Sequence, residues 1–220
     1  MFAPTLRYVL IAVSMALTYS GSASAGPAYD PFGPQTNVSI ATVTAGGWTL
    51  CYEAPYGQDG PSIASAVSTC TGSLMMLAGS ENGSGILSLL AEAPTVDVMF
   101  DTGIGNATHG ANGSEWYFND DWSWGFAPAG APVSRNSCDI AASTSFGGVD
   151  ATTPNRLCWH TANGDMDGGW RVGAADFLLI EPTGFTKFIF TADQNSVPEP
   201  ASLALVGLGL AGLGFSRRKQ

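Results

Sequence analysis

Short apolar runs broken by Gly, Asn, Asp and Pro fill the middle of the chain. Runs of this length are typical of β-strands, because an amphipathic helix needs a longer stretch with a period near 3.6 residues. Residues 47–53 alternate, which places Trp48, Leu50 and Tyr52 on one face. The pattern predicts strands at 38–43, 47–53, 74–78, 86–90, 96–100, 115–118, 157–160, 177–180 and 188–191.

The residues between these runs favour tight turns. Gly83, Ser84 and Gly85 separate two of the runs and predict a hairpin. Many short strands with frequent turns indicate a mainly β fold, either an antiparallel β-sandwich or a barrel-like domain. Residues 73–78 have a short helix as the alternative, because the period of so short an apolar run does not decide its type. The Pro-rich residues 26–35 predict an irregular lead-in.

The composition supports one folded domain over residues 26–193. Gly is abundant at 28 residues and only 12% of residues are charged, which suits a turn-rich β protein better than a helical one. The chain is 45% hydrophobic, with 11 Phe, 6 Trp and 6 Tyr, so it has the side chains to fill a core.

Charge excludes one class of partner. The formal net charge is -10, and between the two ends of the chain the basic residues are Arg135, Arg156, Arg171 and Lys187. The same region holds all of the 18 acidic residues except Glu199, so it is strongly acidic. A surface this acidic repels phosphate backbones, so we expect no nucleic-acid binding.

The first 25 residues have the three parts of a secretory signal peptide. Arg7 supplies the positive start, residues 8–19 are apolar, and Ala23 and Ala25 form an A-x-A cleavage site. The alternative is a permanent N-terminal anchor, but the apolar run is short for a span of about 20 residues. We therefore expect the Sec machinery and signal peptidase as partners during export.

Residues 194–220 form a second targeting segment. Pro198, Glu199 and Pro200 come first, residues 201–215 are apolar and Gly-rich, and residues 216–220 carry the basic side chains Arg217, Arg218 and Lys219. The prolines favour an extended strip that a protease can bind, and the basic end favours the cytoplasmic side of a membrane. The pattern predicts a short C-terminal transmembrane helix, with a permanent anchor as the alternative to a processed one.

This three-part tail resembles the PEP-CTERM sorting signal. The resemblance implies that the apolar segment is held in the inner membrane until an exosortase processes the tail near Pro198–Pro200. It also implies a bacterium that makes exopolysaccharide and biofilm. The expected location is anchored to the inner membrane before processing, then the cell surface or the extracellular space. The body is similar to an uncharacterised exported domain, on motifs such as residues 47–53, 112–118 and 156–161, which implies no mechanism.

The body carries four cysteines, and an even number in an exported chain indicates disulfides. Three pairings are possible. The spacing favours Cys51–Cys70 and Cys138–Cys158, because each closes a local loop of similar length. A zinc site is the alternative, but no two of the cysteines have C-x-x-C spacing.

An aromatic cluster over residues 116–126 is the most distinctive part of the body. Aromatic faces stack on sugar rings and carboxylates accept hydrogen bonds from hydroxyls, so the cluster is a candidate polysaccharide-binding platform. Its candidate ligand-binding residues are Trp116, Asp120, Asp121, Trp122 and Trp124. The alternative is a core hairpin with the two aspartates at its turn.

Residues 163–168 approximate a calcium-binding loop, with Asn163, Asp165 and Asp167 as candidate ligands. Asn replaces the first Asp of the motif, and Ala174 stands where a bidentate Glu is needed. The alternative is a polar turn. Calcium is the single cofactor that the sequence suggests.

Enzyme motifs are absent from the sequence, which has two histidines, His109 and His160. The sequence therefore favours a non-catalytic cell-surface or matrix protein that associates with exopolysaccharide. The alternative is a secreted hydrolase of polysaccharide or peptide, with its acid and base drawn from Glu115, Asp120, Asp121 and His160.

Overall fold

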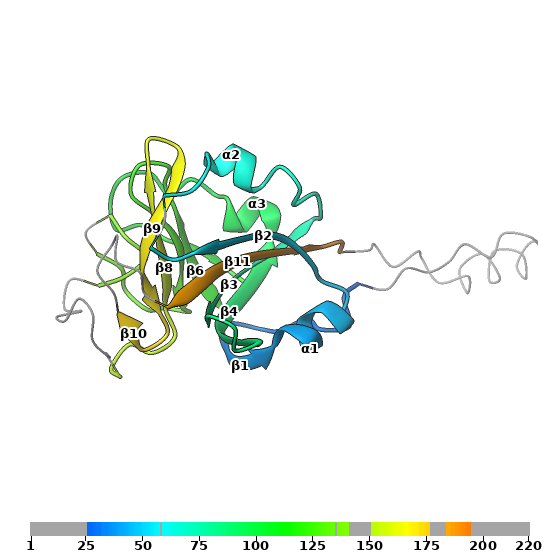
Figure 1. Ribbon diagram of the computed structural model, residues 1–220. Coiled ribbons are helices and arrows are strands. Elements are labelled where there is room, and N and C mark those ends of the chain that lie inside the picture. Colours follow the sequence, from blue (N-terminus) through cyan, green and yellow to red (C-terminus); the bar gives the residue numbers. More distant parts are fainter. Residues whose placement is uncertain (1–25, 58, 135, 141–150, 177–183, 195–220) are drawn as a thin grey trace, which may run out of the picture. The chain divides into compact units, whose positions relative to one another are not determined.

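The computed structural model describes residues 26–57, 59–134, 136–140, 151–176 and 184–194. They belong to one unit of the chain, residues 26–194, built from two antiparallel sheets (Figure 1). The predicted mainly β fold is confirmed. Among the described residues the strands form two separate sheets rather than one closed barrel.

The first sheet has five strands in the order β1-β4-β3-β11-β2. Their bounds are β1 Gln35–Ser39, β4 Ile86–Pro94, β3 Leu74–Glu81, β11 Phe185–Ala192 and β2 Thr49–Pro55. β3 lies in the middle and is buried from Leu74 to Ser80, because both faces of the sheet are covered. β3 and β4 pair through the turn at residues 82–85, which confirms the predicted hairpin.

The second sheet has six strands in the order β10-β9-β8-β7-β6-β5. Their bounds are β10 Ala175–Asp176, β9 Asp165–Val172, β8 Leu157–Ala162, β7 Ser123–Pro128, β6 Ser114–Phe118 and β5 His109–Ala111. Asn163 and Gly164 join β8 to β9, and both have positive φ (51° and 80°). Such a pair favours a two-residue hairpin turn whose twist matches the flanking strands.

The strand predicted at 96–100 is wrong, and the one predicted at 38–43 is wrong beyond Ser39, where β1 ends. Residues 40–45 form the helix α1 (Ile40–Ala45), which Ser39 caps by accepting a hydrogen bond from the Thr42 amide at 3.0 Å. Residues 95–98 form the helical turn α3 (Thr95–Val98), which begins after Pro94. A further helix, α2, covers Ile63–Ala66. The predicted strand at 177–180 lies outside the described residues.

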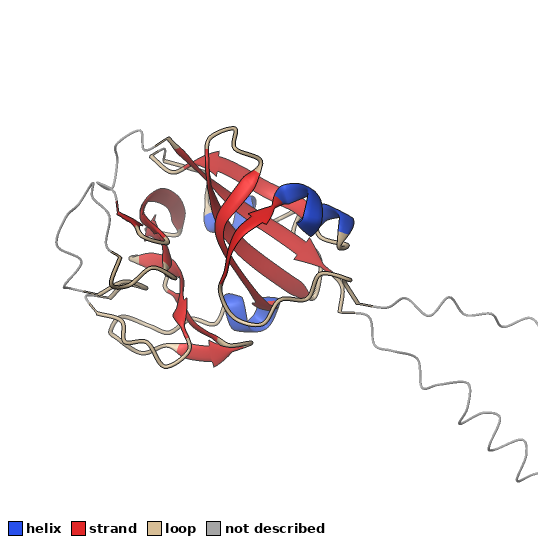
Figure 2. Cartoon of the chain, turned by 90° about the horizontal axis from the view of Figure 1, so that it is seen from below, coloured by secondary structure: helices blue, strands red, loops and turns tan. Residues whose placement is uncertain are grey.

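The main core lies between the two sheets. Alternate residues of β3 and β11 point inward, among them Met75, Leu77 and Ile189, and they belong to the same buried cluster as Trp124 and Trp159. The rings of the two tryptophans meet edge to face at 5.5 Å. The opposite face of the five-stranded sheet packs against α1, which lies across it in Figure 2.

A buried tyrosine links the sheets by hydrogen bonds. The Tyr56 hydroxyl accepts a hydrogen bond from Trp159 Nε1 at 2.7 Å and donates to the Arg171 carbonyl at 3.2 Å. The Tyr56 ring packs directly against Gly169, where a side chain would collide with it, since a Cβ there would lie 2.7 Å from Tyr56 Cδ1. Tyr56 is fully buried, and that burial raises its pKa well above the ordinary value.

A buried lysine makes a second link. The Lys187 ammonium on β11 donates to the carbonyls of Asp167 and Gly168 on β9. The pairing of β9 with β8 shifts register between Trp159 and Thr161, which disrupts the ladder there. Lys187 has no solvent exposure, and burial lowers its pKa to about 8 against the opposing charges of Asp167 and Asp59.

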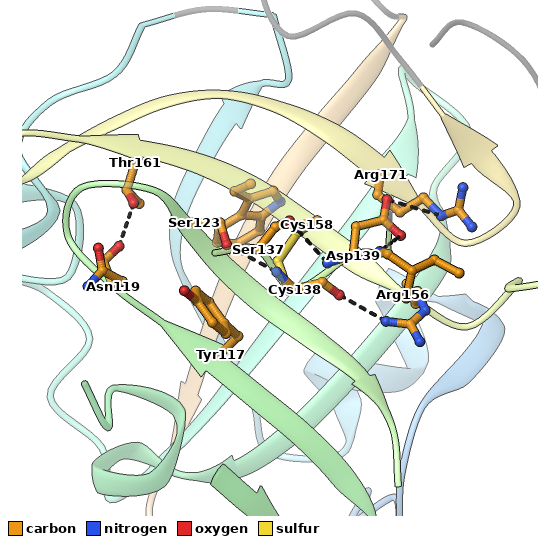
Figure 3. The surroundings of a disulfide bond; sticks show 12 residues. Tyr117, Asn119, Ser123, Ser137, Cys138, Asp139, Arg156, Cys158, Thr161 and Arg171 are labelled. Atoms are coloured by element: carbon orange, nitrogen blue, oxygen red, sulfur yellow. Dashed lines mark hydrogen bonds and ion pairs between the residues drawn. A yellow bond between two sulfur atoms is a disulfide. The ribbon is translucent and has the colours of Figure 1, made fainter. Parts of the chain in front are cut away.

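Both disulfides of the structure have the pairing that the spacing favours. Cys51–Cys70 joins β2 to the residues after α2, and Cys138–Cys158 joins β8 to a loop on the outer face of the second sheet (Figure 3). The second bridge is fully buried, and the Arg156 guanidinium donates to the Cys138 carbonyl at 3.2 Å. It therefore fixes this loop to the sheet.

Replacing both Cys138 and Cys158 by Ala should destabilise the body more than replacing Cys51 and Cys70. The two loops have near-equal lengths, with sequence separations of 20 and 19, so the chain-entropy loss is the same, about 3 kcal/mol each. The buried pair also leaves a cavity. Denaturant unfolding of the two double variants measures the difference, and equal losses would contradict it.

The predicted lead-in at residues 26–35 is irregular up to β1 but held in place. The Asn112 side-chain amide donates to the Pro31 carbonyl at 2.9 Å and to the Glu92 carboxylate. Glu92 is 3% exposed, and burial, with the nearby charge of Asp30, raises its pKa to about 7. A buried carboxyl therefore lies beneath the lead-in.

Glu92→Gln should flatten the dependence of stability on pH. The folded-state pKa lies above the ordinary Glu pKa of 4.5, so this carboxyl contributes stability below pH 4.5 and loses it as the pH rises through about 7. The loss approaches about 3 kcal/mol, from about 1.4 kcal/mol for each pH unit between the two values. Denaturant unfolding from about pH 5 to about pH 7.5 measures it. Glu53→Gln, at an exposed position, is the control and should keep the wild-type slope.

Candidate functional site

Two turns of the second sheet lie side by side at one end of its strands. The turn Asn119–Trp122 joins β6 to β7, and Asn163–Gly164 joins β8 to β9. Thr161 ties them together, because its hydroxyl donates to the Asn119 carbonyl at 2.5 Å (Figure 3) and its amide donates to the Trp122 carbonyl at 3.2 Å. The sequence thus places two separate polar motifs on one surface.

A third segment, residues 59–61, completes this surface. The Gly60 amide donates to the Met166 carbonyl at 2.5 Å, and the Met166 amide donates to the Pro61 carbonyl at 2.9 Å. We call residues 59–61, 119–122 and 163–164 the tip surface. Part of the tip surface borders a hollow of about 240 Å³. The hollow is lined by Asp59, Gly60, Ala162, Asn163, Asp165, Met166 and Asp167.

The carboxyls of Asp59 and Asp167 interact in this hollow. Hydrogen bonding to Asp167, and then its negative charge, raises the pKa of Asp59. Burial acts to raise the pKa of Asp167, but hydrogen bonds from Asp59, His160 and the Gly168 amide outweigh it and hold that pKa below its ordinary value. His160 Nδ1 lies 2.7 Å from Asp167 Oδ2. Because the two carboxyls interact, their protons bind to the pair rather than to each carboxyl independently.

The aromatic residues predicted to form one binding platform are partly buried and partly exposed. Trp116 and Trp124 are 1% and 0% exposed and belong to the core between the sheets, so their part in a platform is a wrong prediction and the core-hairpin alternative holds for them. Alternation along β6 and β7 turns both side chains inward. Trp122 is 44% exposed on the turn, and Asp120 and Asp121 are exposed beside it.

The predicted calcium loop is a hairpin instead. Ala162 pairs with Asp165 across the Asn163–Gly164 turn, so the backbone runs straight into β9 and does not wrap around an ion. Met166 is fully buried between the two aspartates. In the described part of the chain, no three His, Cys, Asp or Glu side chains are grouped closely enough to hold a metal ion.

The residues considered for a hydrolase converge only in part. Glu115 lies away from the lining of the hollow, with its carboxylate accepting from Thr108 Oγ1 at 2.7 Å and from the Gly130 amide at 2.9 Å. Asp121 accepts from the Asn163 amide at 3.2 Å, and His160 contacts Asp167. Sequence reasoning missed Asp59, because its partner Asp167 is more than one hundred residues away along the chain.

Several predicted residues lie outside the described part of the chain. They are Ala23 and Ala25 of the signal cleavage site and Pro198, Glu199, Pro200, Arg217, Arg218 and Lys219 of the tail. In the ranges that the structure does describe, none of the helices has the length and apolar character to cross a bilayer.

Comparison with known proteins identifies the tail. The family model for the PEP-CTERM protein-sorting motif matches residues 196–219. Neither the curated proteins nor the solved structures contain a match to the chain. The match falls on the Pro-Glu-Pro triplet, the apolar segment and the basic end, in the order set out from the sequence. The chain therefore carries a PEP-CTERM protein-sorting motif at residues 196–219, attached to a mainly β body.

Proposed function

We propose that the body acts as a non-catalytic protein of the cell surface or extracellular matrix, and that it binds exopolysaccharide through the tip surface. The sorting motif supports the first part, since it implies export and processing by an exosortase. Entry through the Sec machinery, removal of residues 1–25 by signal peptidase and a transient anchor in the inner membrane belong to this proposal. The final place of action is a biofilm matrix or the outer cell surface.

One observation carries the binding part of the proposal. Trp122 is exposed on a turn whose neighbouring side chains, Asp120 and Asp121, are also exposed. An exposed indole face stacks on the apolar face of a sugar ring, and the carboxylates accept hydrogen bonds from its hydroxyls. Hydrogen bonds from the Thr161 hydroxyl and from the Thr161 and Gly164 amides hold this turn in one conformation, which lowers the entropy cost of binding.

Charge narrows the class of sugar. Asp120 and Asp121 lie beside a hollow lined by Asp59, Asp165 and Asp167. The nearby ammonium of Lys187 is buried and bonded to two carbonyls, so it does not form a direct hydrogen bond or ion pair with a ligand. Such a surface repels uronate-rich polysaccharides and favours neutral sugars or amino sugars that carry an ammonium group.

Trp122→Ala should weaken binding to neutral or amino-sugar polysaccharides by about tenfold, because the stacking partner is lost. The measurement is titration of the folded body, residues 26–194, with a hexosamine polymer and a neutral glucan. Phe32→Ala removes another exposed aromatic side chain, 76% exposed, and is the matched control. The binding proposal fails if wild-type protein binds neither polymer, or if the two variants bind alike.

A secreted hydrolase is the second candidate, and the opposite pKa shifts of Asp59 and Asp167 favour it. A carboxyl whose pKa is raised next to one whose pKa is lowered is the arrangement of a general acid and a general base. The pair opens into the hollow, where a sugar or peptide would reach both carboxyls. The His160 ring holds the Asp167 carboxylate in place.

A turnover assay separates the two candidates. If the body is non-catalytic, wild-type protein should release no reducing ends from a polymer that it binds. If it is a hydrolase, Asp59→Asn and Asp167→Asn should each lower the rate by about a hundredfold, the scale of a lost general acid or base. Asp165→Asn changes a third carboxyl of the same hollow and should keep the rate. Turnover that survives both variants would remove this assignment of acid and base.

A further inference from the structure

We propose that an exposed apolar patch, formed by Val96 on α3 and by Phe100 just after it, rests on the lipid bilayer that holds the sorting tail. This inference depends on the membrane-held tail in the proposed function and not on polysaccharide binding. The occupant is the zwitterionic lipid surface itself.

The patch consists of two apolar side chains that are exposed to solvent. Val96 is 77% exposed and Phe100 is 50% exposed. Val96 lies on α3, and Phe100 follows its C-cap residue, Met99. The Met99 amide donates to the Thr95 carbonyl at 3.0 Å and the Phe100 amide donates to the Asp97 carbonyl at 3.3 Å, so the turn continues as far as Phe100. The Phe100 ring stacks on the His109 ring at 4.3 Å between centroids, which holds it at the surface. Ile104, 68% exposed, follows in the same connection.

The patch lies next to the place where the described chain ends. The Ser73 carbonyl accepts from the Thr95 amide at 2.8 Å, and the Ser73 hydroxyl accepts from the Gln194 amide at 2.6 Å. One residue therefore contacts both the first residue of α3 and the last residue before the tail. Val96 follows Thr95 directly.

The length of the tail keeps this end of the body near the membrane. Residues 195–200 separate Gln194 from the apolar segment that begins at Ala201. Fully extended, the seven Cα-to-Cα steps from Gln194 to Ala201 span at most about 24 Å, from about 3.4 Å for each step. A body of this size is about 40 Å across, by the usual scaling with length. While the tail is anchored, Gln194 therefore stays within about 24 Å of the start of the apolar segment, which is less than the width of the body.

Charge decides the kind of lipid surface. Asp97, Asp101 and Asp193 flank the patch and the exit, and the Asp97 carboxylate lies 2.7 Å from His109 Nε2. Carboxylates repel anionic headgroups, so attraction to the bilayer must come from the apolar side chains. Contact should therefore be strongest on zwitterionic lipid.

Fluorescence depth measurement on the anchored chain tests the proposal. Val96→Trp and the control Ile86→Trp are placed, one at a time, in the mature chain, residues 26–220, reconstituted by its own tail into phosphatidylcholine nanodiscs with brominated acyl chains. Ile86 is 38% exposed and lies at the opposite end of β4 from α3. The emission of the unsubstituted chain is subtracted to remove the native tryptophans.

The Val96→Trp signal should be blue-shifted and lose emission to the bromine atoms, whereas the Ile86→Trp signal should do neither. Adding anionic phosphatidylglycerol should reduce the quenching. Equal quenching at the two positions overturns the proposal. So does a Val96→Trp blue shift in the lipid-free body that grows with concentration, because a second copy would then cover the patch. Reconstitution into the discs reports on the tail separately, so failure of the anchor is distinguishable from failure of the patch.

Discussion

The buried ammonium of Lys187 is the interaction on which the geometry of the candidate site depends. It joins β11 of one sheet to the irregular stretch of β9 in the other, where the Asp167 and Gly168 carbonyls accept its hydrogen bonds. Burying a cation is unfavourable unless its donors are bonded, and the lowered pKa of Lys187 reflects that cost. The hydrogen bond from Lys187 fixes the backbone of Asp167, whose carboxylate is held between His160 and Asp59.

The body has two separate surfaces, one proposed to bind polysaccharide and the other proposed to contact the membrane. The tip surface and its acidic hollow are built by turns of the six-stranded sheet and by residues 59–61. The chain exit and α3 lie where the five-stranded sheet ends, at Ser73 and Gln194. A body held at its exit leaves the tip surface free for a ligand in solution. Its two disulfides suit the oxidising space outside the inner membrane.

Sequence patterns predicted the strands and turns that depend on local residue order. They did not predict which side chains are buried or paired, because contacts between distant parts of the chain determine that. The short apolar runs at 74–78 and 86–90 and the Gly-rich turn between them predicted two strands and a hairpin that the structure confirms. Residues 96–100 read as a strand, but Pro94 ends β4 and a short apolar run does not reveal its own type. Aromatic content located the hairpin of β6 and β7, whereas its inward face, with Trp116 and Trp124 buried, required the packed partner sheet. The pairing of Asp59 with Asp167 has no sequence signal.

The central claim is that the body is a folded, oxidised protein outside the inner membrane, and that both ends of the chain serve as addresses. Mass spectrometry of the protein recovered from its native host tests this most directly. The account predicts a start at Gly26, an end near Pro198–Pro200 and disulfide-linked peptides joining Cys51 to Cys70 and Cys138 to Cys158. A full-length chain in the cytosol with four free thiols would contradict it.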